Sequence, residues 1–180
     1  DTTGDDDAAG DDDTVPVPCY EQPLECPPGL SPLGSPGAFA VITGTVDFNL
    51  DPVSGWSCSE PIYVPVAADT RGFSVGLEST SETTVMGIQK VVAANGTSLL
   101  DLPLMAPADA LADPVGFVVS RIAAIMAPSA SLRVSQSFLP SPQTSVAVIP
   151  SSPSTAIQGG CYAFRAYAGA TSAAIQVPYW

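Results

Sequence analysis

The chain has 180 residues, of which 18 are acidic, 5 are basic and none is histidine, so its net charge is −13. One compact domain with a tail fits this length. Five scattered cations cannot build the Lys and Arg clusters that neutralise phosphates, which excludes a sequence-independent nucleic-acid binder and argues against attachment to anionic lipid. The lack of histidine excludes a Ser-His-Asp triad and His-ligated zinc.

Residues 1–13 are strongly acidic: they hold seven aspartates and no cation, which leaves 11 acidic and 5 basic groups, a net charge of −6, on residues 14–180. Such a segment has nothing apolar to bury and its carboxylates repel one another, so we interpret it as an extended, solvated tether. The alternative is a weak, local Ca²⁺ site, because hard cations prefer clustered carboxylate oxygens. Its candidate ligands are the aspartates of two GDDD blocks: Asp5, Asp6, Asp7, Asp11, Asp12 and Asp13.

Residues 14–37 contain seven of the nineteen prolines, which is incompatible with helix or central strand and predicts an extended arm. The cysteines show no C-x2-C pair and no histidine accompanies them, so two disulfides are a simpler account than zinc. Of the three connectivities we favour Cys19–Cys26, a staple within the arm, together with Cys58–Cys161. Disulfides predict an oxidising compartment.

From residue 38 onward the sequence changes to short apolar runs separated by turn residues. Phe73, Val75 and Leu77 share one face of such a run, and Asn95-Gly96 is a strong hairpin signal. We predict strands at 39–48, 62–67, 72–77, 83–93, 98–102, 131–138, 144–149, 161–168 and 172–179. This pattern predicts an all-β fold, an antiparallel β-sandwich or jelly roll, over residues 38–180.

Residues 106–128 depart from that pattern. Their apolar positions repeat with helical spacing, at Val115, Val118, Val119, Ile122, Ile125 and Met126, and predict one short helix over about 113–127. Asp113 and Pro114 fit the N-cap and first helical positions, and Pro128 ends the run. A strand over 116–120 is the competing interpretation, since valine also favours strands.

The last hairpin, QGGCYAFRAYAGATSAAIQVPY, resembles the final strand pair of bacterial pre-peptidase C-terminal domains. VPVAADTRGFSVGLES, followed by IQKVVAANGTSLLD, is similar to that family's opening strands and central Asn-Gly hairpin. The resemblance covers about half of the chain, and residues 103–130 would be an insertion. It implies a small β-sandwich, appended to secreted proteins, that binds or positions and does not catalyse.

The sequence has no run of 18 apolar residues, so we expect no transmembrane segment. It begins with Asp1, as a processed chain would. The Asp/Thr/Gly-rich start resembles the tether that follows the lipidated cysteine of bacterial surface lipoproteins. That resemblance implies an exported protein, extracellular or on the outer cell surface, anchored through a residue that this sequence does not contain.

No motif for catalysis stands out. The only lysine, Lys90, has no S-x-x-K pattern around it, no phosphate-binding loop occurs, and nothing positions a pair of carboxylates in a cleft. We therefore expect no enzyme and, apart from the candidate Ca²⁺, no cofactor.

The expected function is a non-catalytic extracellular module with a structural, adhesion or binding role at the bacterial surface, and its partner is a protein or polysaccharide surface. One alternative is an accessory or pro-region domain of a secreted hydrolase whose catalytic part lies outside this chain. The other is a subunit of a self-assembling surface structure, which would make the protein a homo-oligomer.

Overall fold

The computed structural model of the chain describes residues 16–33, 40–80, 86–102, 104, 109, 112–113, 115–116, 132–135, 143–150, 152, 155–169 and 172–180. In this part of the chain there are ten strands: β1 (Ala40–Leu50), β2 (Ser57–Ser59), β3 (Ile62–Val66), β4 (Phe73–Glu78), β5 (Met86–Val92), β6 (Ser98–Asp101), β7 (Leu132–Ser135), β8 (Gln143–Val148), β9 (Gly160–Ala168) and β10 (Ser172–Tyr179). Every pairing between them is antiparallel.

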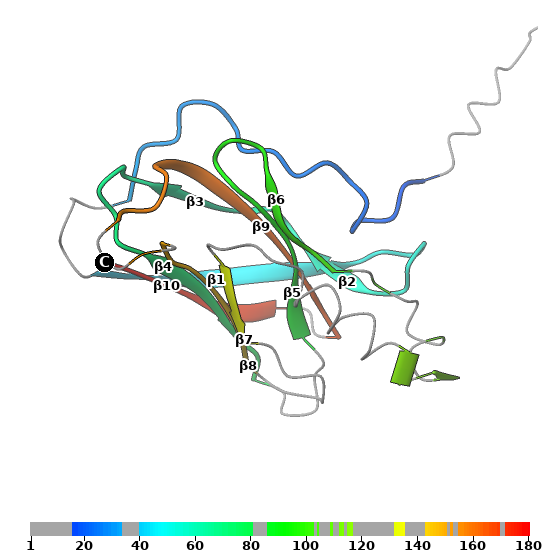
Figure 1. Cartoon of the computed structure of the whole chain (residues 1–180). Helices are drawn as coiled ribbons and strands as arrows, with labels where there is room; N and C mark the ends of the chain where they lie inside the picture. The colour runs from blue at the N-terminus through cyan, green and yellow to red at the C-terminus, as the bar shows by residue number, and fades with distance from the viewer. Residues whose placement is uncertain are drawn as a thin grey trace, which may run out of the picture.

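The strands form one sheet that curls on itself (Figure 1). Its order is β6-β5-β9-β2-β1-β10-β4-β8-β7, and β3 also pairs with β9. The long strand β1 joins the two halves, because Ala40–Asp47 pair with β10 while Phe48–Leu50 pair with β2. The predicted all-β, antiparallel class is confirmed, in the form of one curled sheet.

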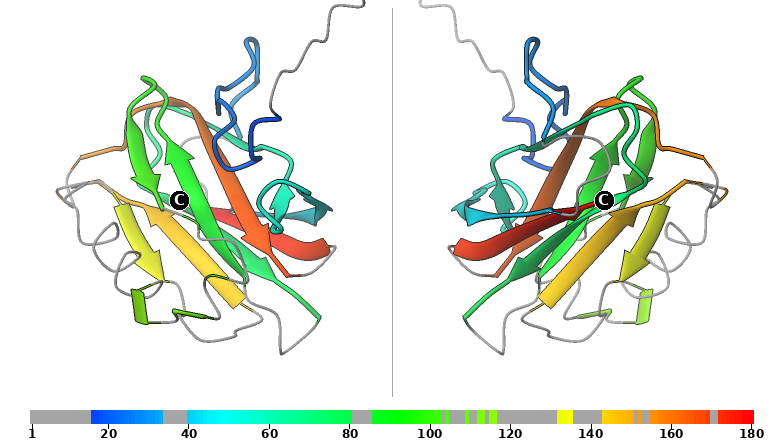
Figure 2. Two further views of the ribbon diagram at one scale, coloured as in Figure 1. Left: turned by 90° about the vertical axis from the view of Figure 1, so that its right-hand side faces the viewer. Right: turned by 90° about the vertical axis from the view of Figure 1, so that its left-hand side faces the viewer.

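The curl places the core between the two halves of the sheet (Figure 2). Phe73 of β4 packs edge-on against Tyr162 and Phe164 of β9, with ring centroids 5.2 and 5.9 Å apart. The predicted alternation of β4 is confirmed, since Phe73, Val75 and Leu77 are all buried. These three side chains belong to the buried apolar core, whose removal from water favours this fold.

The Asn95-Gly96 hairpin is also confirmed. It joins β5 to β6, with Gly96 at a φ of 81° that favours glycine. The Asn95 side chain accepts a hydrogen bond from Thr97 N at 3.0 Å, and Ala93 N donates to Thr97 O at 2.8 Å. Local turn chemistry therefore sets the register of this edge of the sheet.

Some sequence predictions fall on residues outside the described part. The helix over about 113–127 does so almost entirely; within it, Asp113 Oδ1 accepts a hydrogen bond from Gly116 N at 2.9 Å, as an N-cap would. The acidic tether and all its candidate Ca²⁺ ligands also lie outside the described residues.

Candidate functional site: the arm over strand β9

Strand β9 is buried on both faces, which is unusual for a sheet with only one core. Tyr162, Phe164 and Ala166 point into the core, as their alternation predicts. On the opposite face Arg165 is 4% exposed and Tyr167 1% exposed. Something must therefore cover the outer face of β9.

The cover is the proline-rich segment of residues 16–33, hereafter the arm, together with the loop after β1. Leu24 of the arm is buried, and Trp56 of the loop packs edge-on against Tyr167 with ring centroids 5.2 Å apart. The arm then reaches β3, where Leu33 N donates to Pro65 O at 2.7 Å. The arm has no strand or helix of its own in its described residues, as its prolines predict.

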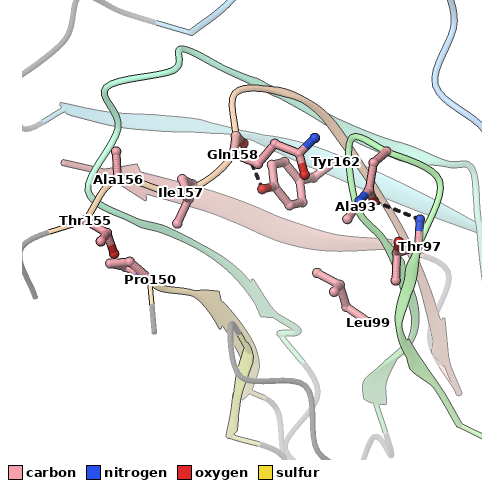
Figure 3. Close-up of a pocket in the computed structure, with 10 residues that line it drawn as sticks. Ala93, Thr97, Leu99, Pro150, Thr155, Ala156, Ile157, Gln158 and Tyr162 are labelled. Atoms are coloured by element: carbon pink, nitrogen blue, oxygen red, sulfur yellow. Dashed lines mark hydrogen bonds between the residues drawn. The ribbon is translucent and has the colours of Figure 1, made fainter. Parts of the chain in front are cut away.

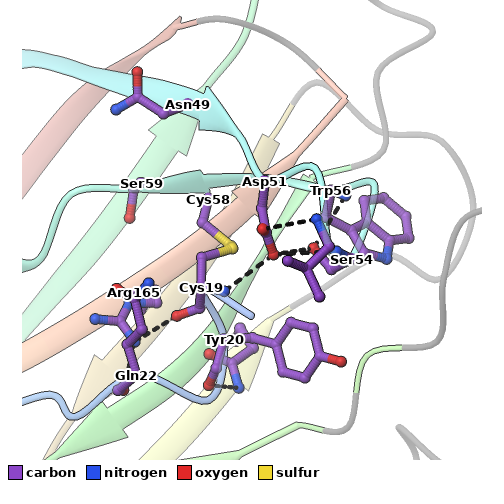
Figure 4. The surroundings of a disulfide bond; sticks show 12 residues. Cys19, Tyr20, Gln22, Asn49, Asp51, Ser54, Trp56, Cys58, Ser59 and Arg165 are labelled. Atoms are coloured by element: carbon purple, nitrogen blue, oxygen red, sulfur yellow. Dashed lines mark hydrogen bonds between the residues drawn. A yellow bond between two sulfur atoms is a disulfide. The ribbon is translucent and has the colours of Figure 1, made fainter. Parts of the chain in front are cut away.

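Both disulfides fasten this arm to the sheet. One joins Cys19 to Cys58, with a Cα–Cα distance of 6.2 Å (Figure 4). The other joins Cys26 to Cys161, with a Cα–Cα distance of 6.1 Å. The predicted pairing of Cys19 with Cys26 and of Cys58 with Cys161 is therefore wrong. The physical reason is that the arm lies along the sheet, so each of its cysteines faces a different strand instead of the other cysteine.

Between these two disulfides the arm is held by Arg165. Its guanidinium donates to Cys19 O and Gln22 O, both at 2.7 Å, and to Pro23 O at 3.3 Å. Burial lowers the pKa of Arg165, and the neighbouring Tyr63 and Glu60 oppose that change. A guanidinium titrates so far above neutral pH that it stays charged here, and its fork of donors satisfies carbonyls that a strand ladder does not reach.

Asp51 holds the other side of the first disulfide (Figure 4). Its carboxylate accepts hydrogen bonds from Cys19 N at 3.0 Å, Val53 N at 3.1 Å, Ser54 N at 3.2 Å and Ser54 Oγ at 2.6 Å. Burial by itself raises the pKa of Asp51, but the four donors outweigh it and hold the pKa below its usual value. This carboxylate is thus committed to closing the loop and binding the arm.

A cleft of about 440 Å³ opens beside the Cys19–Cys58 disulfide, between the arm and the β1–β2 region. Half of its lining residues are polar: Gln22, Asn49, Asp51, Ser59, Glu60 and Arg165. Glu60 is exposed and accepts a hydrogen bond from Asn49 Nδ2 at 3.5 Å, whereas Ser59 Oγ accepts one from Ala166 N at 3.0 Å. Carboxylate, carboxamide and hydroxyl groups in one cleft can hydrogen-bond a polar ligand such as a sugar or a peptide.

A second, smaller pocket of about 220 Å³ lies under the β5–β6 hairpin (Figure 3). The Tyr162 hydroxyl, which lines it, donates to Gln158 O at 2.8 Å, and burial raises the pKa of that hydroxyl. Leu99 and Ile157 lie beside Thr155 and Gln158 in its lining, so apolar and polar side chains both face this pocket.

Sequence reasoning did not identify Arg165 or Asp51. A signal existed for each: Arg165 is a lone charge inside the apolar run CYAFRAYA, and Asp51 begins DPVS, in which an aspartate precedes proline and serine as in an Asx turn. The candidate Ca²⁺ ligands are not placed by the structure. Among the described residues, no group of three or more Asp, Glu, Cys or His side chains could hold a metal ion.

In the described part of the chain, no helix is both long and apolar enough to cross a membrane. Comparisons with known proteins leave the family open: no family model, no curated protein and no solved structure matches this chain.

Proposed function

We propose that this protein is an exported, non-catalytic β-sheet module that binds a polar partner through the cleft beside its arm. The observation that carries the proposal is the double fastening of the arm: two disulfides 39 and 135 residues in span hold one irregular segment against the sheet. Disulfides of this structural kind persist in oxidising compartments and are rare in the cytosol.

The fastening also supports a binding role. One wall of the cleft comes from the arm, through Gln22 and Pro23. The other comes from Asn49 of β1 and from Glu60, which lies between β2 and β3. Because the covalent bonds fix these walls before any ligand arrives, little ordering free energy is lost on binding. The polar groups and modest size of the cleft favour a segment of polysaccharide or a polar peptide over an apolar ligand.

The test compares two variants with the same change of charge. Glu60→Gln alters the cleft, while Asp69→Asn alters an exposed carboxylate that does not line it. Binding of the full, oxidised chain to an array of immobilised oligosaccharides and peptides should fall at least tenfold for Glu60→Gln and stay unchanged for Asp69→Asn. Equal loss in both variants, or no binder that depends on Glu60, would contradict the proposal.

A second candidate function, a subunit of a self-assembling surface structure, is favoured by one specific observation. That observation is the edge of β1 opposite β10, where residues 40–47 pair with no other described strand.

A further inference from the structure

Among the residues that the structure describes, strand β1 has an open edge over most of its length. Ala40–Asp47 pair with β10 on one side, while on the other side β1 meets β2 only at Phe48–Leu50. All five residues from 41 to 45 are exposed, with Val41 47% and Ile42 39% accessible. At about 3.3 Å per residue, the unpaired edge is roughly 26 Å long, enough for another strand.

The other edges in the described part of the sheet are protected. Strand β3 contains Pro65 and is bridged by Leu33 of the arm. Strand β6 has only four residues and ends in Asp101, which forms an ion pair with Lys90 at 3.0 Å. Strand β7 is equally short and contains Arg133 in its sequence. Proline, charge, shortness and covering segments are the usual means of preventing strand addition.

By contrast, the edge of β1 has none of these protective features. Residues 40–46 (AVITGTV) contain no proline and no charged side chain, and they are rich in β-branched residues. An exposed, neutral edge with apolar side chains is the surface on which a further strand pairs most readily.

We propose that the open edge of β1 binds β1 of a second copy of this chain, in an antiparallel, two-fold pairing centred on Thr43. In that register Thr43 lies opposite Thr43 of the second copy, Val41 opposite Thr45, and Ile42 opposite Gly44. Each pairing is favourable, because Thr–Thr and β-branched pairs stabilise antiparallel sheets and glycine leaves room for isoleucine.

Charge favours a second copy over a charged foreign strand. The edge offers no side-chain charge to a charged partner between residues 40 and 46, and a copy of β1 is equally neutral there. The nearest charge, Asp47, falls opposite residue 39 in this register, so the two aspartates lie at opposite ends of the ladder. Because the whole chain carries a net charge of −13, association should strengthen as salt screens the repulsion between copies.

The proposal concerns a different surface from the cleft and does not rest on the ligand proposed above. A monomeric protein would overturn it and leave the cleft proposal intact, while loss of cleft binding would leave it unaffected.

The experiment is sedimentation of the full, oxidised chain over a hundredfold concentration range, at low and moderate salt. We expect a monomer–dimer equilibrium that shifts toward dimer with salt. Thr43→Lys should weaken it at least tenfold, because charge on an edge strand blocks pairing. The matched control, Ser98→Lys, places the same charge on the edge strand β6 and should leave it unchanged. Unaltered thermal unfolding of both variants shows that they fold.

A cysteine variant tests the register. Thr43→Cys places two thiols directly opposite each other across the two-fold axis, at a separation from which a disulfide forms. Under mild oxidation it should form covalent dimers at least ten times faster than Ser98→Cys. A wild-type chain that stays monomeric throughout, equal sensitivity to both lysines, or equal cross-linking of both cysteines would each overturn the proposal. Amide hydrogen exchange in which β1 is protected only when a foreign strand is added, and not at high concentration of the chain itself, would also overturn it.

Discussion

Replacing Arg165 tests how the arm is held. Its side chain is 4% exposed and donates to three carbonyls of the arm. The informative change is Arg165→Met, because methionine keeps most of the volume and removes every donor. The three carbonyls, from Cys19, Gln22 and Pro23, then lie against an apolar side chain with no donor to replace the guanidinium.

The size of the effect follows from the bond lengths. Two bonds are short, at 2.7 Å, and the third, at 3.3 Å, is too long to add much. Hydrogen bonds to a charged group are each worth about 1.5–3 kcal/mol net, and removing the buried charge relieves part of its desolvation cost. Using the low end for the two short bonds, we expect the free energy of unfolding to fall by about 3 kcal/mol, or about 6–12 °C in Tm for a chain of this length.

The assay is denaturant unfolding of the oxidised protein, combined with amide hydrogen exchange. Exchange should accelerate at Gln22 and Leu24, which lie between the two anchored cysteines, and should change little in β4. Arg165→Lys is the control: it keeps the charge but lacks the fork of donors, so we expect an intermediate loss. A stability for Arg165→Met within about 0.5 kcal/mol of the wild type would refute the reasoning, because it would mean that the carbonyls need no donor.

Three further variants follow from the same structure. Cys26→Ser with Cys161→Ser opens a covalent loop of 135 residues, so chemical denaturation should show a loss of about 5 kcal/mol in the chain-entropy account, and an unchanged midpoint would contradict the observed pairing. Because the pKa of Asp51 is lowered in the folded protein, its carboxylate contributes stability above the unfolded value of 3.8 and loses it as the pH falls through the folded value. Unfolding of Asp51→Asn should therefore differ from the wild type most at about pH 6 and least at about pH 3, and a gap that widened on acidification would reverse the sign. Gly160→Ala should cost about 2–3 kcal/mol in thermal unfolding, because Gly160 has a φ of 131° and an added Cβ would lie 2.6 Å from Ala94 Cβ; a neutral result would show that this turn relaxes freely.

Most of the fold could be predicted because its signals are local. Alternation of apolar residues identified β4, and the Asn95-Gly96 pair identified the β5–β6 turn. Strand β2 was missed, since three residues are too few for alternation to show. The order of strands in the curled sheet could not be predicted, because it depends on pairings such as β2 with β9 that join residues far apart in the chain.

The candidate site was less predictable, and for a related reason. The arm was correctly predicted to lack helix and central strand, but the sequence does not show what it packs against. Cys19 and Cys26 are close in sequence, which suggested a disulfide between them, yet Cys19 is bonded to Cys58 and Cys26 to Cys161. Alternation along β9 places Arg165 on the face opposite the core, and the sequence does not show that the arm buries it there.

The burial of Arg165 and the burial of the arm depend on each other. A segment with so many prolines cannot form a regular ladder, so its carbonyls must be satisfied in another way or remain in water. Burying it against β9 therefore requires a side chain with several donors and no acceptor, and arginine meets that requirement better than any other residue. In the part of the chain that the structure describes, Arg165 forms no ion pair, and the three carbonyls around its guanidinium compensate for its burial. Burial of the arm therefore depends on Arg165, and burial of Arg165 depends on the arm. The two disulfides hold the arm against the sheet, which fixes the walls of the cleft beside them.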